Sequence, residues 1–233
     1  MSEPTPYNPL DKINLGLSVA EALLGRKPVA LGGLERFNGA GIYALYYVGS
    51  FKAYHALSVR NADADGLVAP IYVGKAVPAG GRKGASLSTT PRTFALWNRL
   101  REHAESIGSA PNLRLNDFQS RYLVVDDIWI PLGESLMIAK FSPIWNSLID
   151  GFGNHDPDKG RYLGMRTRWD MLHPGRAWAD RCAARPETAD DIDREVRSHL
   201  ERLEPPPSLH FLVEERKIRY RMNRSEDDGT QTD

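Results

Sequence analysis

The chain has 233 residues, 30 basic and 30 acidic side chains, and a hydrophobic content of 41%. These values predict one sizeable globular domain with extensions. The single cysteine, Cys182, excludes an internal disulfide and a two-cysteine zinc site. We expect it to be a partly buried side chain in a reducing, cytoplasmic setting. The polar, proline-rich start is unlike a signal peptide, and no run of about 18 apolar residues predicts a membrane-spanning helix.

The neutral total conceals an uneven distribution of charge. Residues 73–122 hold eight basic and three acidic side chains, and residues 159–185 hold seven basic and two acidic ones, so each segment carries +5. The acids concentrate after Pro186 and at residues 225–228. Two positive patches would suit a phosphate backbone. A mixed, solvated surface is the simpler explanation of the charges taken alone.

The first half of the chain predicts a helix followed by two strands. Apolar residues recur at spacings of three and four through residues 10–24, which is typical of an amphipathic helix. Residues 41–48 are β-branched and aromatic and predict a strand, and residues 70–74 predict a second one. Residues 51–69 between them predict a short helix and a polar loop. Residues 77–90 predict a glycine-rich loop with a basic centre that lacks the spacing of a P-loop.

The second half is predicted to be mainly helical. A Thr-Thr-Pro sequence begins a helix that runs from Thr90 to Ile107. Its expected buried stripe consists of Phe94, Trp97, Leu100, Ala104 and Ile107. A third strand is predicted at 121–125, further helices at 131–148 and 187–203, and a late strand around 218–222. The first ten residues and the last dozen are expected to be disordered.

Five short elements follow one another in an order that carries chemistry. They are Gly41-Ile42-Tyr43 on one strand, Tyr72-Val73-Gly74 on the next, Arg99 with His103 four residues later on a helix, Glu134 in the first turn of a later helix, and Asn146. Each element alone has an ordinary structural explanation, such as a helix-dipole carboxylate or neighbours on a solvated helix face. Together and in this order they resemble the GIY-YIG nuclease superfamily over residues 40–150.

The resemblance implies an α/β (α+β) fold, in which a small three-stranded antiparallel sheet is flanked by helices. Residues 40–150 would form the nuclease core with a basic loop insertion. Residues 1–39 would be an N-terminal arm and helix, residues 151–222 a C-terminal extension for DNA recognition or dimerisation, and residues 223–233 a disordered acidic tail.

Phosphodiester hydrolysis explains why these residue types occur together. The reaction needs an activated water, stabilisation of charge on the phosphate, and help for the leaving oxygen. Glu134 is a hard oxygen ligand for one Mg²⁺, for which Mn²⁺ can substitute. Arg99 can clamp the scissile phosphate with its planar fork, and His103 can accept or relay a proton. Asn146 is expected to hold the site together.

The identity of the general base stays open among three residues. Tyr43 is the family's usual candidate, but a tyrosine with a pKa near 10 is a poor base unless a cation such as Lys75 lowers that pKa. Tyr72 is expected to hydrogen-bond the water or the phosphate. His103 is the third possible proton acceptor.

Within the superfamily, the chain looks most like the type II restriction enzymes, because of the stretch 150–157, the basic loop and the flanking segments. That resemblance implies a homodimer that cuts double-stranded DNA at a short, GC-rich palindrome, with a cognate DNA methyltransferase in the same system. Arginines read guanine in the major groove. The residues expected to contact DNA are Arg82, Lys83, Asn154, His155, Arg161, Arg166 and Arg168.

Other functions are kept as alternatives. The protein could be a structure-specific repair or mobile-element nuclease, or a DNA-binding protein whose nuclease core is catalytically inactive. A PD…ExK nuclease, built on Pro157-Asp158 and Glu215-Arg216-Lys217, is disfavoured because its pieces are common and lie 57 residues apart. A second metal site at residues 154–156 with His173 is disfavoured against a simple polar loop.

Overall fold

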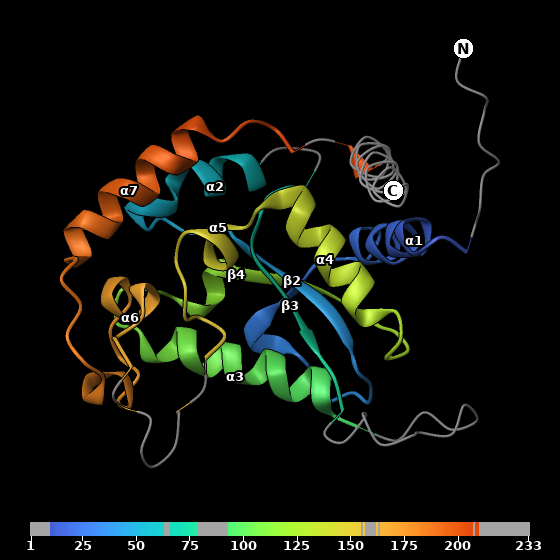
Figure 1. Ribbon diagram of the computed structural model, residues 1–233, viewed down its shortest axis with the longest axis horizontal. Helices are drawn as coiled ribbons and strands as arrows, with labels where there is room; N and C mark the ends of the chain where they lie inside the picture. Colours follow the sequence, from blue (N-terminus) through green and yellow to red (C-terminus); the bar gives the residue numbers. More distant parts are fainter. Residues whose placement is uncertain are drawn as a thin grey trace, which may run out of the picture.

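A central antiparallel sheet organises the protein in the computed structural model (Figure 1). The structure describes residues 10–62, 66–78, 93–154, 156, 162, 164–206 and 208–209. The strands are β1 (Val29–Ala30), β2 (Gly41–Tyr47), β3 (Pro70–Ala76) and β4 (Phe118–Val124), in the spatial order β1-β4-β2-β3. The helices are α1 (Lys12–Leu24), α2 (His55–Asn61), α3 (Ala95–Ser109), α4 (Ile130–Phe141), α5 (Ile144–Ser147), α6 (Arg168–Leu172) and α7 (Ala189–Arg202).

The strand β2 lies in the interior of the sheet and β3 forms one of its edges. All seven residues of β2 are buried, because helices cover both faces of the sheet. This burial explains why β2 is continuously apolar and aromatic instead of alternating with polar residues. The three-stranded antiparallel core predicted from the sequence is confirmed, and the two-residue strand β1 adds a fourth member beside β4.

Alternate residues of β2 pack into two different layers. Tyr43, Leu45 and Tyr47 face a large aromatic core that includes residues of α3, α5, α6 and α7. The intervening Ile42, Ala44 and Tyr46 face a smaller core formed with α1 and α4. Figure 1 shows α1 and α4 together on one side of β3 and α3 on the other. The edge strand β3 therefore lies where the two layers meet.

Two features of the predicted helices are wrong. Residues 131–148 do not form one helix, because Ser142 takes a left-handed backbone conformation (φ 41°) and Pro143 follows it, so that α4 ends at Phe141 and α5 begins at Ile144. The helix α4 also begins before Pro131, at Ile130, which leaves Glu134 beyond the first turn.

The buried stripe of α3 is also different from the predicted one. It consists of Leu96, Leu100, His103 and Ile107. Phe94 and Trp97 are only partly buried and lie beneath the guanidinium of Arg36, which is 3.8 Å from the Phe94 ring centre. The helix begins at Ala95, whereas Thr90 and Pro91 lie outside the described residues. The rotated stripe places His103 in the core.

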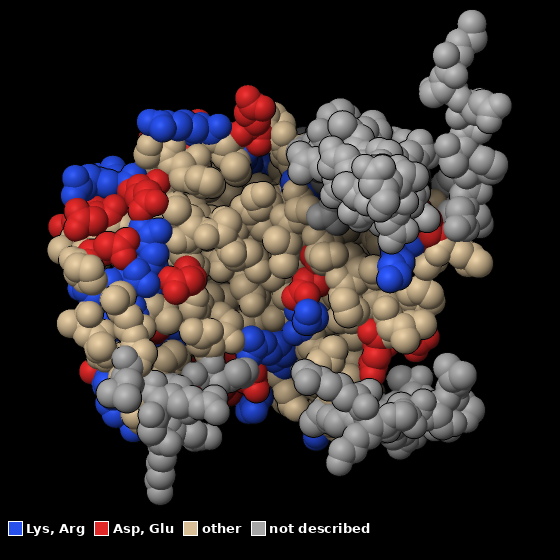
Figure 2. All heavy atoms as spheres, in the orientation of Figure 1, with Lys and Arg blue, Asp and Glu red and all other residues tan. Residues whose placement is uncertain are grey.

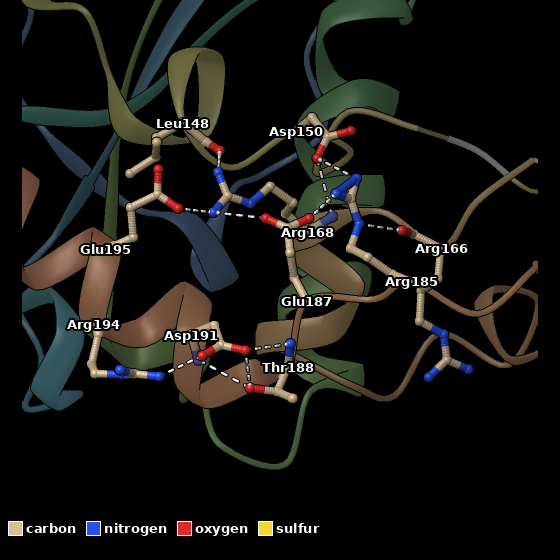
Figure 3. A network of polar contacts seen from close by, with 10 residues as sticks. All are labelled: Leu148, Asp150, Arg166, Arg168, Arg185, Glu187, Thr188, Asp191, Arg194 and Glu195. Atoms are coloured by element: carbon tan, nitrogen blue, oxygen red, sulfur yellow. Dashed lines mark hydrogen bonds and ion pairs between the residues drawn. The ribbon is translucent and has the colours of Figure 1, made fainter.

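The C-terminal part is held in place by α7, which packs against α2 and α6, and by a network of ion pairs. Thr188 and Asp191 form a capping box at the start of α7. Figure 3 shows Arg168 between the carbonyl of Leu148 and the carboxylates of Glu187 and Glu195. These contacts join α5, α6 and α7. The strand predicted around residues 218–222 and both predicted disordered ends lie largely or wholly outside the described residues.

Cys182 is partly buried, as predicted. In the described part of the chain, no helix combines the length and apolar content needed to cross a bilayer.

Candidate active site

The two motif tyrosines lie on the same face of the sheet. In the β2–β3 register, Tyr43 is opposite Gly74 and Tyr72 is opposite Leu45, so the tyrosines are diagonal neighbours. Their ring centres are 6.2 Å apart. Tyr43 is fully buried, whereas Tyr72 is partly exposed. The sheet thus presents one tyrosine within the core and the other toward solvent.

Gly74 makes the close approach of the tyrosines possible. A Cβ atom at this position would lie 2.4 Å from the hydroxyl of Tyr43 and 2.9 Å from Cε1 of Tyr72. The last residue of the Tyr72-Val73-Gly74 motif therefore leaves space for the phenol of the first motif. A side chain at this position would force the Tyr43 ring to move.

His103 of α3 completes a buried pair with Tyr43. The Tyr43 hydroxyl and His103 Nε2 are 2.5 Å apart, and both side chains are buried. The imidazole is stacked on the Phe152 ring, with a centroid distance of 4.4 Å and an interplanar angle of 16°. Burial raises the pKa of Tyr43 well above 10, the negative charge of an ionised Tyr72 raises it further, and Arg99 lowers it.

Arg99 lies one helical turn before His103 and is aimed at the same centre. Its Nη2 donates to the carbonyl of Gly153 at 2.6 Å, and its Nη1 is 3.2 Å from Oε2 of Glu102. Burial raises the pKa of Tyr72, while the charge of Arg99 lowers it. Arg99 is therefore the cation that acts on both phenols, the role for which the sequence suggested Lys75.

Glu134 and Lys75 reach the site from the opposite layer. Lys75 lies two residues after Val73 on the face of β3 that packs against α4, and its Nζ is 2.6 Å from Oε2 of Glu134. The Glu134 side chain is 17% exposed. Its negative charge is one of the lesser causes of the raised pKa of Tyr43 and of Tyr72, after burial. The edge of β3 thus separates the tyrosines from the carboxylate.

Asn146 joins α5 to this edge. Its Oδ1 accepts from the backbone N–H of Val73, and its Nδ2 donates to the carbonyl of the same residue, both at 2.8 Å. The side chain therefore satisfies both backbone groups that Val73 presents at the free edge of the sheet. This geometry fits the role expected of Asn146, which is to hold the site together.

Figure 2 shows a small mixed patch of basic and acidic side chains where β3 passes between α4 and α3. The patch lies beside a broad uncharged area on the same face.

The contacts described above bring together all seven residues expected to form the catalytic centre. They are Tyr43, Tyr72, Lys75, Arg99, His103, Glu134 and Asn146. In the described residues, no three His, Cys, Asp or Glu side chains form a ready-made metal cluster.

The residues expected to contact DNA are not gathered in the same way. Arg168 has a 13% exposed side chain that donates to the carbonyl of Leu148 at 2.9 Å and pairs with Glu195. Arg166 donates to the carbonyl of Ala179 at 3.1 Å and pairs with Asp180. Both guanidiniums would have to leave these partners to read guanine. Asn154 is exposed beside the site, whereas Arg82, Lys83, His155 and Arg161 lie outside the described residues.

Sequence reasoning missed the turn at residues 151–154, which packs against the side chains that α3 and β3 contribute to the site. The sequence indicated this stretch as a likeness to restriction enzymes and predicted a DNA contact at Asn154, but it did not predict contacts with Arg99 or His103. Phe152 lies against both His103 and Tyr72, and Gly153 accepts from Arg99. A buried arginine, Arg176, holds the turn through its carbonyls. The only signal in the sequence was the pair of glycines around a lone aromatic residue.

Comparison with known proteins agrees with this geometry. The sequence model of the Eco29kI GIY-YIG domain matches residues 35–200, well over half of the chain. The match includes all seven residues of the expected catalytic centre and extends past residue 150 into the expected C-terminal extension. No curated protein matches the chain. With its tyrosine pair, arginine, histidine, glutamate and asparagine around one sheet edge, the chain belongs to the Eco29kI GIY-YIG domain family of restriction endonucleases.

Proposed function

We propose that this nuclease is a type II site-specific deoxyribonuclease that hydrolyses double-stranded DNA at a short, GC-rich palindrome with one Mg²⁺ in each active site. The observation that carries the proposal is the 2.5 Å contact between the Tyr43 hydroxyl and His103 Nε2 beside Arg99. This contact supplies a proton acceptor next to a phosphate-binding cation, which hydrolysis of a phosphodiester requires.

Tyr43 and His103 act together as the general base. Because burial raises the pKa of Tyr43 well above 10, a free Tyr43 phenolate would be scarce at neutral pH. His103 Nε2 removes this obstacle by accepting the phenol proton as the hydroxyl of Tyr43 takes a proton from the attacking water. The water reaches this pair from the side of Tyr72, the partly exposed member of the group. The proton ends on His103 as an imidazolium, so Tyr43 need not persist as a phenolate.

Arg99 binds the scissile phosphate. Its guanidinium is held in place by the carbonyl of Gly153 and by Glu102 on the next turn of α3. Guanidinium groups pair with phosphate oxygens in a planar, bidentate geometry. As the phosphate enters, it takes the place of the partly exposed Glu102 carboxylate, while the bond to Gly153 keeps the fork oriented.

Glu134 is suited to hold a single Mg²⁺. Magnesium keeps several of its waters and is usually bound by one or two carboxylates together with phosphate oxygens. One partly exposed carboxylate, paired with Lys75 of the strand that also carries Tyr72, matches that donor set. When bound, the metal supplies charge stabilisation for the phosphate and the leaving oxygen, and Mn²⁺ would substitute for it. Lys75 must release Glu134 for this binding.

Cutting both strands at a palindrome requires two such centres related by a two-fold axis. Each chain provides one edge of β3 with one set of catalytic side chains. A homodimer is the simplest assembly that supplies two centres with matching symmetry. A restriction enzyme can also cut the DNA of the cell that makes it, so we expect a methyltransferase of the same specificity to accompany this protein.

A cleavage assay tests the proposal. Purified protein is incubated with phage or plasmid DNA with and without Mg²⁺, beside Glu134→Ala and the control Glu105→Ala, which changes an exposed carboxylate on α3. We expect discrete fragments from the wild type and the control only, and only with Mg²⁺. If the protein cuts flaps or branched DNA but no plain duplex, the restriction function is wrong and a structure-specific nuclease replaces it.

A further inference from the structure

We propose that Arg176 is a positioning residue of the nuclease, which fixes the turn at residues 151–154 and, through this turn, the orientation of Arg99 and His103. The catalytic consequence of this inference rests on the proposed function. The positioning itself does not, because it follows from contacts among residues that lie far apart in the sequence.

Arg176 is anchored by a buried ion pair. Its Nε and Nη2 donate to the two carboxylate oxygens of Asp170, each at 2.7 Å, and the two side chains are 5% and 1% exposed. Thr167 Oγ1 donates to the same carboxylate at 2.7 Å. The guanidinium also lies over the rings of Trp169 and Trp178, at 4.4 and 4.7 Å from their centres. This surrounding holds the plane of the fork.

The remaining donors of Arg176 all go to the turn. Nη2 donates to the carbonyl of Gly151 at 3.0 Å, and Nη1 donates to the carbonyls of Phe152 and Asn154, each at 3.2 Å. With the two bonds to Asp170, these contacts use the five N–H groups of a guanidinium. A lysine carries three donors at a single point and cannot reproduce this pattern.

The turn transmits this fixed geometry to the catalytic side chains. The carbonyl of Gly153 accepts from Arg99 at 2.6 Å. The ring of Phe152 is stacked on His103 and meets Tyr72 edge-on, with a centroid distance of 4.9 Å to the latter. A Cβ at Gly153 would lie 2.7 Å from the Tyr72 hydroxyl, so little free space separates the turn from the site. A shift of the turn must therefore move Arg99, His103 or Tyr72.

Arg121 on β4 provides a matched control away from the turn. It is also partly buried and donates to two backbone carbonyls, those of Arg26 at 2.9 Å and Leu67 at 2.6 Å. Replacing Arg121 by lysine weakens a network that includes neither the turn at residues 151–154 nor a residue of the expected catalytic centre. Any loss caused only by reduced stability should appear in both variants.

The test compares Arg176→Lys with Arg121→Lys in the full chain. The single-turnover cleavage rate is measured at saturating protein, together with DNA affinity and thermal stability. We expect Arg176→Lys to lower the cleavage rate about 100-fold, the usual cost of a small misplacement of catalytic groups, with DNA affinity unchanged. Arg121→Lys should cleave at the wild-type rate.

A second readout does not depend on nuclease activity. In protein labelled with ¹³C-histidine, the His103 ring signal is assigned by its loss in His103→Gln. Stacking on Phe152 shifts this signal upfield in the wild type, and we expect Arg176→Lys to reduce the shift and Arg121→Lys to keep it. If Arg176→Lys is unfolded, the neutral pair Asp170→Asn/Arg176→Met replaces it, since it leaves no buried charge unpaired.

The outcomes separate the two proposals. Equal cleavage rates in the two lysine variants, or a His103 signal that does not move in Arg176→Lys, would overturn the positioning role. If the wild type cleaves no DNA, the proposed function fails, and the His103 signal alone still decides whether Arg176 positions this side chain.

Discussion

The hydroxyl of Tyr43 and Nε2 of His103 lie 2.5 Å apart, although 59 residues separate them in the chain and both are buried. The strand β2 supplies the phenol and α3 supplies the imidazole, and Gly74 leaves the space in which they meet. This contact joins the first GIY-YIG motif to α3, the helix that carries Arg99, the proposed phosphate-binding residue.

Replacing His103 by glutamine should separate proton transfer from hydrogen bonding. The glutamine carbonyl can still accept from Tyr43, but it cannot take up a proton. We expect the single-turnover rate to fall about 100- to 10,000-fold, the range usual for loss of a general base, while DNA affinity stays unchanged. Stopped-flow or quenched cleavage at saturating protein measures the rate. A glutamine variant that cleaves as fast as the wild type would exclude His103 as the proton acceptor.

Gly74→Ala should damage the site more than its size suggests. The new Cβ would lie 2.4 Å from the Tyr43 hydroxyl, so the phenol must move away from His103. We expect a destabilisation of about 1–3 kcal/mol, as for other overpacked core positions, and a strong loss of cleavage. Urea unfolding and cleavage rates provide the two measurements. The control is Gly108→Ala on α3, where a Cβ meets nothing within 4 Å and the helix should become more stable.

Asn146→Asp should weaken the edge of the sheet. The aspartate still accepts from the N–H of Val73 but sets a carboxylate against its carbonyl, where Nδ2 of Asn146 now donates. We expect a loss of about 1 kcal/mol in the free energy of unfolding, the usual net value of one hydrogen bond, together with slower cleavage. Asn98→Asp, an exposed change on α3, should alter neither quantity. Equal stability of the two variants would contradict the role given to Asn146.

Lys75→Gln should strengthen metal binding in the absence of DNA. The lysine is 42% exposed and pairs with Glu134, so it would compete with the proposed metal for this carboxylate. Exposed ion pairs are worth at most about 1 kcal/mol, so we expect affinity for Mn²⁺ to rise up to about fivefold. Electron paramagnetic resonance of free Mn²⁺ measures this affinity without any need for activity. Unchanged or weaker binding in Lys75→Gln would show that the lysine does not occupy the metal site.

Acid should destabilise the protein through His173. Burial lowers the pKa of His173 to about 3, while an unfolded histidine titrates near 6.5. Between these two values the unfolded chain binds a proton that the folded chain does not bind, so stability falls as the pH drops below 6.5. At pH 5 the loss should be about 2 kcal/mol relative to pH 7.5.

His173→Gln should be stable to a similar degree at both pH values, apart from the titration of other groups. The variant loses the histidine but keeps polar groups near Tyr54 and Asn112, the hydrogen-bond partners of the ring. Urea unfolding at pH 7.5 and pH 5 compares it with the wild type and with the control His55→Gln, which is exposed. If the wild type and His173→Gln lose equal stability at pH 5, the buried histidine is not the cause.

The residues that carry chemistry were predictable because their types and order are distinctive. Tyr43, Tyr72 and Glu134 lie around the same edge strand β3 although they come from three elements, and the family motifs already implied this. The buried stripe of α3 was predicted only in part: Leu100 and Ile107 are confirmed, but His103 was left out. His103 is polar, so a pattern of apolar residues excludes it from the core, yet it is buried against Phe152.

Contacts between distant residues were beyond a reading of one sequence. Arg166 and Arg168 look like free cations in a basic segment, but Asp180 and Glu195 neutralise them in the folded chain. Arg176 shows no periodic or motif signal, and its role depends on carbonyls 22 to 25 residues earlier. Net charge along a segment therefore gave a poor guide to which arginines are available to DNA.

Cleavage of plasmid DNA by Tyr43→Phe tests most directly whether Tyr43 and His103 activate the water. This change removes only the hydroxyl that contacts His103 and preserves the buried ring. We expect the wild type to produce discrete fragments with Mg²⁺, while Tyr43→Phe binds the same DNA and leaves it uncut. Fragments formed by Tyr43→Phe at the wild-type rate would contradict the central claim that the Tyr43–His103 pair activates the water.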